Sequence, residues 1–163
     1  MSGSQYRWAE NGSPARLLDH SKAKHDVYRE YLRRYVRELT KDIRISKLSI
    51  NVVDGFCGGG VYPPERGSEL VYGSPVIFLE VMREMQAEVQ SRRTAPFDLN
   101  YRLHLVDKSP EAMESVRRVV QQKGFGHLIG ERVFLHQKSF EEALPSLLED
   151  VKGRGHTIFV LDQ

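Results

Sequence analysis

The chain has 163 residues, of which 40% are apolar and 28% are charged, a composition typical of a globular domain rather than of a disordered or membrane protein. Its single cysteine, Cys57, excludes an internal disulfide, and no Cys/His spacing resembles a structural zinc site. No apolar run approaches the ~20 residues that span a bilayer, and the first residues lack the pattern of a signal peptide. We therefore expect a cytoplasmic protein with no membrane association and no structural metal.

The net charge of +2 conceals an asymmetry along the chain. The first 48 residues carry eleven Lys or Arg against six Asp or Glu, and the remainder carries an acidic excess. A basic N-terminal third is compatible with a nucleic-acid partner, because cations near phosphates release counterions. The alternative is a solvated, charged helix face.

We expect a first segment, residues 1–20, followed by the N-terminal portion of a single domain over residues 21–163. Ser21 is placed to cap an amphipathic helix. Arginines lie largely between its apolar positions. The apolar positions recur at helical spacing and are Val27, Tyr28, Tyr31, Leu32, Tyr35, Val36 and Leu39. His25 shares this face, which favours packing in the core.

A strand, a glycine loop and a helix follow. "KLSINVVD" predicts a buried strand that ends at Asp54, and four glycines lie within residues 55–60. After a loop from Val61 to Gly73, Ser74 is the predicted cap of a long helix with Pro75 at its first helical position.

The same alternation then repeats. "YRLHLVD" predicts a strand that ends at Asp107, with Ser109 as the cap of the next helix. "ERVFLHQ" predicts a third strand, after which Ser139 and Glu142 have the spacing of a capping box. "GHTIFVLDQ" predicts a fourth strand with Asp162 at its tip.

Alternating strands and helices indicate an α/β fold, with a parallel sheet covered by helices on both faces. Ligands of such open sheets bind beyond the carboxyl ends of the strands. The fourth strand has no helix after it and would leave an apolar face exposed. We therefore expect the natural chain to continue beyond Gln163.

Several ligands can be compared with the glycine loop. A phosphate-binding P-loop requires a Lys-Ser or Lys-Thr pair that is missing here. A dinucleotide loop requires a third glycine where Pro63 stands, and Asp54 would repel a pyrophosphate. A cysteine phosphatase requires an arginine close to its nucleophile, but Arg66 lies nine residues beyond Cys57. We interpret Cys57 as an incidental loop residue.

The loop fits S-adenosylmethionine better. This cofactor carries an ammonium and a sulfonium and no phosphate, so an acid at the strand tip offsets positive charge. The pattern of Asp54, Gly55, Phe56, Gly58 and Gly60 allows the backbone to approach the methionine moiety closely.

Residues at the other strand tips complete the predicted site. Asp107, followed by Lys108, is placed to accept both ribose hydroxyls. Ser139 and Phe140 would contact the adenine, although a simple helix cap also explains Ser139. Asp162 is the predicted catalytic residue that meets the methyl acceptor, with closure of the cofactor site as the alternative. His25, as an alternative to core packing, would cover the methionine end.

Taken together, the blocks "DGFCGGG", "YGSPVIFLE", "LHLVDKSPEAM", "VFLHQKSFEEALPSLL" and "IFVLDQ" resemble a class I S-adenosylmethionine-dependent methyltransferase. More narrowly, "SKAKHDVYREYLRRYV" upstream of "VVDGFCGGGVY" and "GSPVIFLE" is similar to the bacterial three-Cys-motif partner family. The resemblance implies a Rossmann-like doubly wound parallel sheet, of which this chain supplies about four strands. It also implies S-adenosylmethionine as cofactor and a protein bearing a three-cysteine motif as partner.

Our first hypothesis is a methyltransferase of unknown acceptor, with nucleic acid slightly favoured. The fourth tip reads Asp-Gln and lacks the Asp/Asn-Pro-Pro-aromatic pattern of enzymes that methylate exocyclic amines. The second hypothesis is a non-catalytic or differently catalytic module of a protein complex that keeps the same fold. A nicotinamide oxidoreductase comes third.

Overall fold

The computed structural model of the chain describes residues 19–63 and 69–162, and the side chains of residues 19–22 are outside it. The predicted N-terminal segment thus lies almost wholly beyond the described residues, as does Gln163. Four strands form the main sheet: β1 (Lys47–Asp54), β4 (Asp98–Asp107), β5 (Val133–Gln137) and β6 (His156–Val160). The helices are α1 (Asp19–Leu39), α2 (Ser74–Ser91), α3 (Pro110–Gln122) and α4 (Phe140–Val151), with a short 3-10 turn, η1 (Gly126–Leu128).

The four strands are parallel and lie in the order β5-β4-β1-β6. This order is that of the first half of a Rossmann-like sheet, in which the chain passes outward from the first strand and then returns to its other side. The reversal falls between β1 and β6, where Asp54 is paired with Val160. The crevice in which such sheets bind ligands is therefore expected at the carboxyl ends of these two strands.

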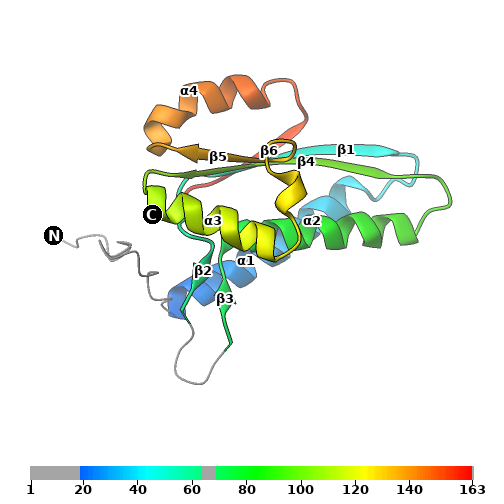
Figure 1. Cartoon of the computed structure of the whole chain (residues 1–163). Coiled ribbons are helices and arrows are strands. Elements are labelled where there is room, and N and C mark those ends of the chain that lie inside the picture. Colours follow the sequence, from blue (N-terminus) through cyan, green and yellow to red (C-terminus); the bar gives the residue numbers. More distant parts are fainter. Residues whose placement is uncertain (1–18, 64–68, 163) are drawn as a thin grey trace.

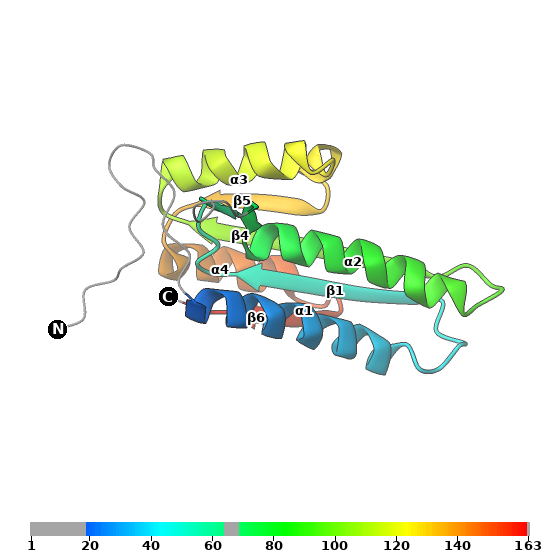
Figure 2. The ribbon, with the colours of Figure 1, turned by 90° about the horizontal axis from the view of Figure 1, so that it is seen from below.

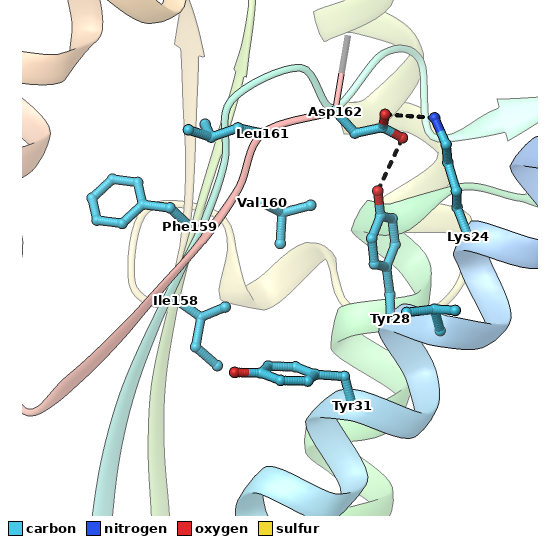
Figure 3. Close-up of a pocket in the computed structure, with 9 residues that line it drawn as sticks. Lys24, Tyr28, Tyr31, Ile158, Phe159, Val160, Leu161 and Asp162 are labelled. Atoms are coloured by element: carbon cyan, nitrogen blue, oxygen red, sulfur yellow. Dashed lines mark hydrogen bonds and ion pairs between the residues drawn. The ribbon is translucent and has the colours of Figure 1, made fainter.

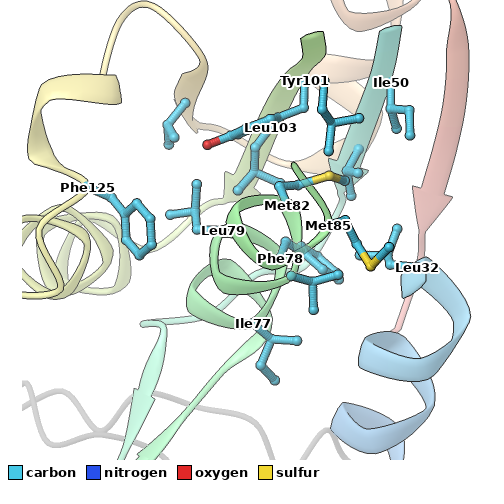
Figure 4. Packing of buried hydrophobic residues seen from close by; sticks show 14 of the residues in the cluster. Leu32, Ile50, Ile77, Phe78, Leu79, Met82, Met85, Tyr101, Leu103 and Phe125 are labelled. Atoms are coloured by element: carbon cyan, nitrogen blue, oxygen red, sulfur yellow. The ribbon is translucent and has the colours of Figure 1, made fainter. Parts of the chain in front are cut away.

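Helices cover both faces of the sheet, as the alternating pattern predicts. In Figure 1, α4 lies on one face while α1, α2 and α3 lie on the other, and Figure 2, seen from below, shows these three side by side in front of the strands. The larger apolar core fills the space on the three-helix side, where Phe78 and Met82 of α2 meet Ile50 of β1 and Leu103 of β4 (Figure 4). A smaller cluster lies under α4 and includes Val106.

Two of the four predicted helix caps are confirmed, and two are wrong. Ser109 accepts a hydrogen bond from the backbone N–H of Ala112, and Ser139 forms a full capping box with Glu142. The cap of α2 is Gly73, one residue earlier than predicted, because the hydroxyl of Ser74 binds the carboxylate of Asp54 instead. Helix α1 begins at Asp19, so Ser21 lies inside it and does not precede it.

The segment Val61–Gly73, predicted as a loop, contains a small antiparallel hairpin of β2 (Val61–Tyr62) and β3 (Val71–Tyr72). The backbone N–H of Gly73 donates to the carbonyl of Gly60 at 2.9 Å and closes the base of the hairpin. The hairpin projects away from the sheet on the side of α1 (Figure 1). Its tip, residues 64–68 with Arg66, lies outside the described residues.

Helices α1 and α2 pack together through a ladder of ion pairs. Arginines on α1 and glutamates on α2 recur at every fourth residue, so each turn of one helix meets a turn of the other. The pairs are Arg29–Glu80 at 3.7 Å, Arg33–Glu84 at 2.8 Å and Arg37–Glu88 at 2.9 Å. The ladder joins α1 to α2 along three successive turns, beside the apolar contacts of Leu32 and Val36 in the core. Across residues 19–63 and 69–162, no helix combines the length and the apolar character that crossing a membrane requires.

Candidate functional site

Asp54 ends β1 with its side chain buried under the N-terminus of α2. One carboxylate oxygen accepts a 2.5 Å hydrogen bond from the hydroxyl of Ser74, and the other accepts from the backbone N–H of Phe56 at 3.3 Å. Burial raises the pKa of Asp54 to about 6, and the charges of Asp107 and Asp162 add to this effect. Asp54 is therefore an anion at neutral pH whose negative charge is only partly compensated.

The glycine loop after Asp54 is tied to the strands on both sides. The backbone N–H of Gly55 donates to the carbonyl of Val160 on β6, and that of Cys57 donates to Val106 on β4. Gly58 has a φ of +59°, a left-handed conformation that glycine adopts without a steric penalty. The loop thus crosses the ends of β6, β1 and β4 at the predicted ligand crevice.

Asp107 binds this loop directly. One of its carboxylate oxygens accepts from the backbone N–H of Gly58 at 3.1 Å, and the other accepts from the N–H of Ser109 at 2.8 Å. The predicted second acid is therefore adjacent to the glycine loop, as a shared site requires. Lys108, in contrast, is exposed to solvent. No described contact connects Lys108 with the loop.

The predicted adenine-contacting residue Phe140 packs against the loop itself. Its ring lies 5.9 Å from that of Phe56, between centroids. A Cβ atom on Gly55 would stand 2.9 Å from the Phe140 ring and 2.8 Å from Leu161. Glycine admits both side chains, one from the residue after β6 and one from the start of α4, whereas a larger residue here would require them to move.

The two remaining loop and cap residues have structural roles. The hydroxyl of Ser139 accepts the backbone N–H of Glu142 at 3.2 Å, as the alternative explanation of this residue predicts. Gly60 has a φ of +73° and lies against Val116 of α3 and Pro75 of α2. It marks the point where the loop passes into the hairpin.

Asp162, two residues beyond the end of β6, is bound by α1. Lys24 donates to one carboxylate oxygen at 2.5 Å, and the Tyr28 hydroxyl donates to the other at 3.0 Å (Figure 3). Lys24 and Tyr28 are four residues apart and therefore share one face of the helix. Burial raises the pKa of Tyr28, and the hydrogen bond to Asp162 raises it further, so the phenol remains a donor.

Three acids thus lie at the ends of three neighbouring strands. Asp107, Asp54 and Asp162 follow one another in the order of β4, β1 and β6, and the charges of the outer two both act on Asp54. Such an arrangement attracts a cationic ligand and repels a phosphate. Cys57 is buried near Asp54 and Asp107, and burial raises the pKa of its thiol, which opposes a role as nucleophile.

Two pockets flank α1. One, of about 450 Å³, lies between α1 and β6 and includes Lys24, Tyr28 and Asp162 in its wall (Figure 3). The other, of about 590 Å³, lies between α1, α2 and the hairpin and includes His25 and Glu80. Neither is lined by Asp54 or Asp107, so of the predicted site residues only Asp162 borders a described pocket.

The basic helix and His25 are both engaged within the protein. Three arginines of α1 form the ion-pair ladder with α2, so each of these charges has an acidic partner within the protein. His25 packs between the rings of Tyr28 and Tyr62, with centroid distances of 6.4 and 5.7 Å. His25 therefore lies between α1 and the hairpin, at the edge of the apolar core.

Three side chains that bind the predicted acids are not in the predicted site. Ser74 binds Asp54, and Lys24 and Tyr28 bind Asp162, across 20, 138 and 134 residues of sequence. Ser74 was assigned as a helix cap, and Tyr28 belongs to an apolar stripe that predicts only burial. The hydrogen-bond partners of such residues depend on tertiary packing, which the hydrophobic periodicity of the sequence does not predict.

Comparison of the sequence with protein-family models and with curated proteins finds no match to either.

Proposed function

We propose that this protein is an S-adenosylmethionine-dependent methyltransferase of the class I type, and that it belongs with the three-Cys-motif partner family that its sequence resembles. The observation that carries the proposal is the order of groups along the strand ends. Phe140 follows β5, Asp107 ends β4, Asp54 and the glycine loop follow at β1, and Asp162 lies beyond β6. In the cofactor, adenine is followed by ribose and then by the sulfonium of the methionine moiety, which bears the methyl group. Adenine, ribose and methionine therefore follow one another in the same order as Phe140, Asp107 and the glycine loop after Asp54.

Each group at this edge fits one part of the cofactor. Asp107 has lone pairs beyond the two that its backbone partners use, and these suit a ribose diol. The ring of Phe140 offers an apolar face to adenine. Asp54 and Asp162 supply negative charge toward the ammonium and sulfonium. The absence of a P-loop lysine agrees with a cofactor that has no phosphate.

When bound, S-adenosylmethionine supplies an electrophilic methyl group. The contribution of this chain is to bind the cofactor, orient it and exclude water, because methyl transfer depends chiefly on alignment. The hydrogen bonds from Ser74 and from the Phe56 N–H hold the Asp54 carboxylate in one orientation. The glycine loop keeps the ends of β1, β4 and β6 in register.

Calorimetric titration of the protein with S-adenosylmethionine tests the proposal. We expect Asp107→Ala to lower the affinity by about tenfold or more, since it removes charge-assisted hydrogen bonds worth about 1.5–3 kcal/mol. The matched control is Asp98→Ala, which removes a carboxylate from the opposite end of β4 and should leave the affinity unchanged. Circular dichroism verifies that both variants fold. If the wild-type protein shows no binding, the proposal is wrong.

One observation favours a second function, a non-catalytic module of a protein complex that keeps the fold. Phe140 and Leu161 already cover Gly55, where the backbone would approach a ligand. In that case the contacts of Asp107 with Gly58 and Ser109 only stabilise the loop. The same titration separates the two functions, because a purely structural edge would bind neither S-adenosylmethionine nor its demethylated product.

A further inference from the structure

The carboxylate of Asp162 is held from one side by two donors of a single helix. Lys24 and Tyr28 each occupy one of its oxygens, across more than 130 residues of sequence. The side chain of Asp162 is nevertheless 36% exposed. A carboxylate offers about four lone-pair sites, and the contacts described here use two of them. The oxygens can therefore bind a further group while α1 keeps their orientation.

The direction of the Tyr28 hydroxyl is determined by packing. Its ring lies against Phe78 of α2, with 5.9 Å between centroids, and against His25 on its own helix. The arginine–glutamate ladder fixes α1 on α2, beginning with Arg29, the next residue after Tyr28. Tyr28 is thus a rigid donor, whereas Lys24 has a long and flexible stem.

The tip of β6 is fixed from the other side as well. The Leu161 side chain lies over Gly55, and the carbonyl of Val160 accepts the N–H of Gly55 at 3.0 Å. Asp162 therefore stands beside the glycine loop, close enough for its charge to act on Asp54 and on His25. Its carboxylate lies beyond the end of β6, next to the reversal of strand order between β1 and β6.

We propose that Tyr28 is a positioning residue that directs the Asp162 carboxylate toward the sulfonium end of the cofactor, so that the site distinguishes the charged S-adenosylmethionine from neutral S-adenosylhomocysteine. The inference rests on the proposed function. Lys24 balances the charge of the carboxylate, and Tyr28 sets its direction. The two ligands share adenine, ribose and amino acid and differ in the methyl group and the charge on sulfur. The ratio of their affinities therefore reports on the surroundings of the sulfur and its methyl group, and not on the shared adenine, ribose and amino acid.

The test measures both dissociation constants by calorimetry for four proteins and one double variant. Asp162→Asn should shift the affinity ratio against S-adenosylmethionine by about three- to tenfold, as expected for the loss of one nearby, partly solvated charge. Tyr28→Phe removes only an oxygen and should shift it by about two- to threefold in the same direction. Tyr31→Phe, the control, removes the same atom one turn further along the wall of the same pocket and should not shift it.

Because Tyr28 acts through Asp162, Tyr28→Phe should have no further effect on the ratio in the Asp162→Asn background. Thermal unfolding shows whether each variant folds. If Tyr28→Phe weakens both ligands equally, or if its effect adds to that of Asp162→Asn, the positioning role is wrong while the proposed function stands. If the wild-type protein binds neither ligand, the proposed function is wrong and this inference falls with it.

Discussion

At the scale of single residues, the most unusual polar contact outside the candidate site is a pair of histidines under α4. His104 is fully buried, and its Nδ1 lies 3.1 Å from Nε2 of His136 on the next strand. Its other nitrogen has no hydrogen-bond partner among the described residues. Two imidazoles in this contact need one donor and one acceptor, so both cannot be charged. Burial lowers the pKa of His104 to about 4, with His136 and Arg102 adding to the effect and Asp150 opposing it.

This lowered pKa predicts a loss of stability in acid. The usual pKa of histidine is 6.5, so between pH 6.5 and about 4 the unfolded chain takes up a proton that folded His104 excludes. The stability is complete above pH 6.5 and falls by about 2–3 kcal/mol as the pH approaches 4. We expect His104→Leu to reduce this dependence in urea unfolding measured across the range.

Asp54 acts in the opposite direction. Its raised pKa means that the folded state takes up a proton first as the pH falls through about 6, which favours folding. We therefore compare the slope of unfolding free energy against pH between the variant and the wild type. Asp54 contributes equally to both slopes, so its effect cancels in their difference. Leu135→Val, on the other face of β5, is the control and should lower stability equally at every pH. Equal slopes for His104→Leu and wild type would contradict the prediction.

At the scale of elements, the sequence predicted the four main-sheet strands and the four α-helices, but it missed the hairpin of β2 and β3 and most contacts between elements. Capping boxes and Ser-Pro pairs act within one turn, so the starts of α3 and α4 are readable from local sequence. The start of α2 was misplaced because Ser74 is engaged by Asp54, twenty residues earlier. The basic N-terminal third left a nucleic-acid partner and a solvated helix face open as interpretations, and the structure pairs three arginines of α1 with glutamates of α2.

The ion-pair ladder gives a prediction at this scale. Arg37 binds both oxygens of Glu88, through Nε and Nη2 at 2.9 Å each, and Glu88 is only 20% exposed. We expect Arg37→Met to lower the free energy of unfolding by about 1 kcal/mol, less at high salt. Arg34→Met, whose partner Glu30 lies on the same helix, should cost only a few tenths of a kcal/mol. Equal costs for the two variants in urea unfolding would show that the ladder adds nothing to stability.

At the scale of the whole molecule, strand order determines which backbone is most protected. β1 pairs with β4 and β6, and β4 pairs with β1 and β5, so these two strands are central. β6 pairs only with β1 among the described strands, and Phe159 and Leu161 at its end are 38% and 55% exposed. Parallel strands are usually covered on both faces, so β6 is the least protected part of the sheet.

Hydrogen exchange tests this order. We expect the amides of β1 and β4 to exchange only through global unfolding, and those of β6 to exchange through local opening at lower free energy. Mass spectrometry of exchanged peptides over the full chain measures the difference. Protection of β6 equal to that of β1 would contradict the order, and would mean that another strand pairs with β6.

The sequence by itself determined the alternation of strands and helices, the parallel sheet and the acids at three strand ends. These follow from periodicity, caps and turn residues, all of which act over a few neighbours. Only the tertiary structure decided that Ser74 and Tyr28 bind those acids, that Phe140 and Leu161 cover Gly55, and that the basic helix is paired with α2. These contacts join segments far apart in the chain, and their energies depend on distances and burial that no local pattern encodes.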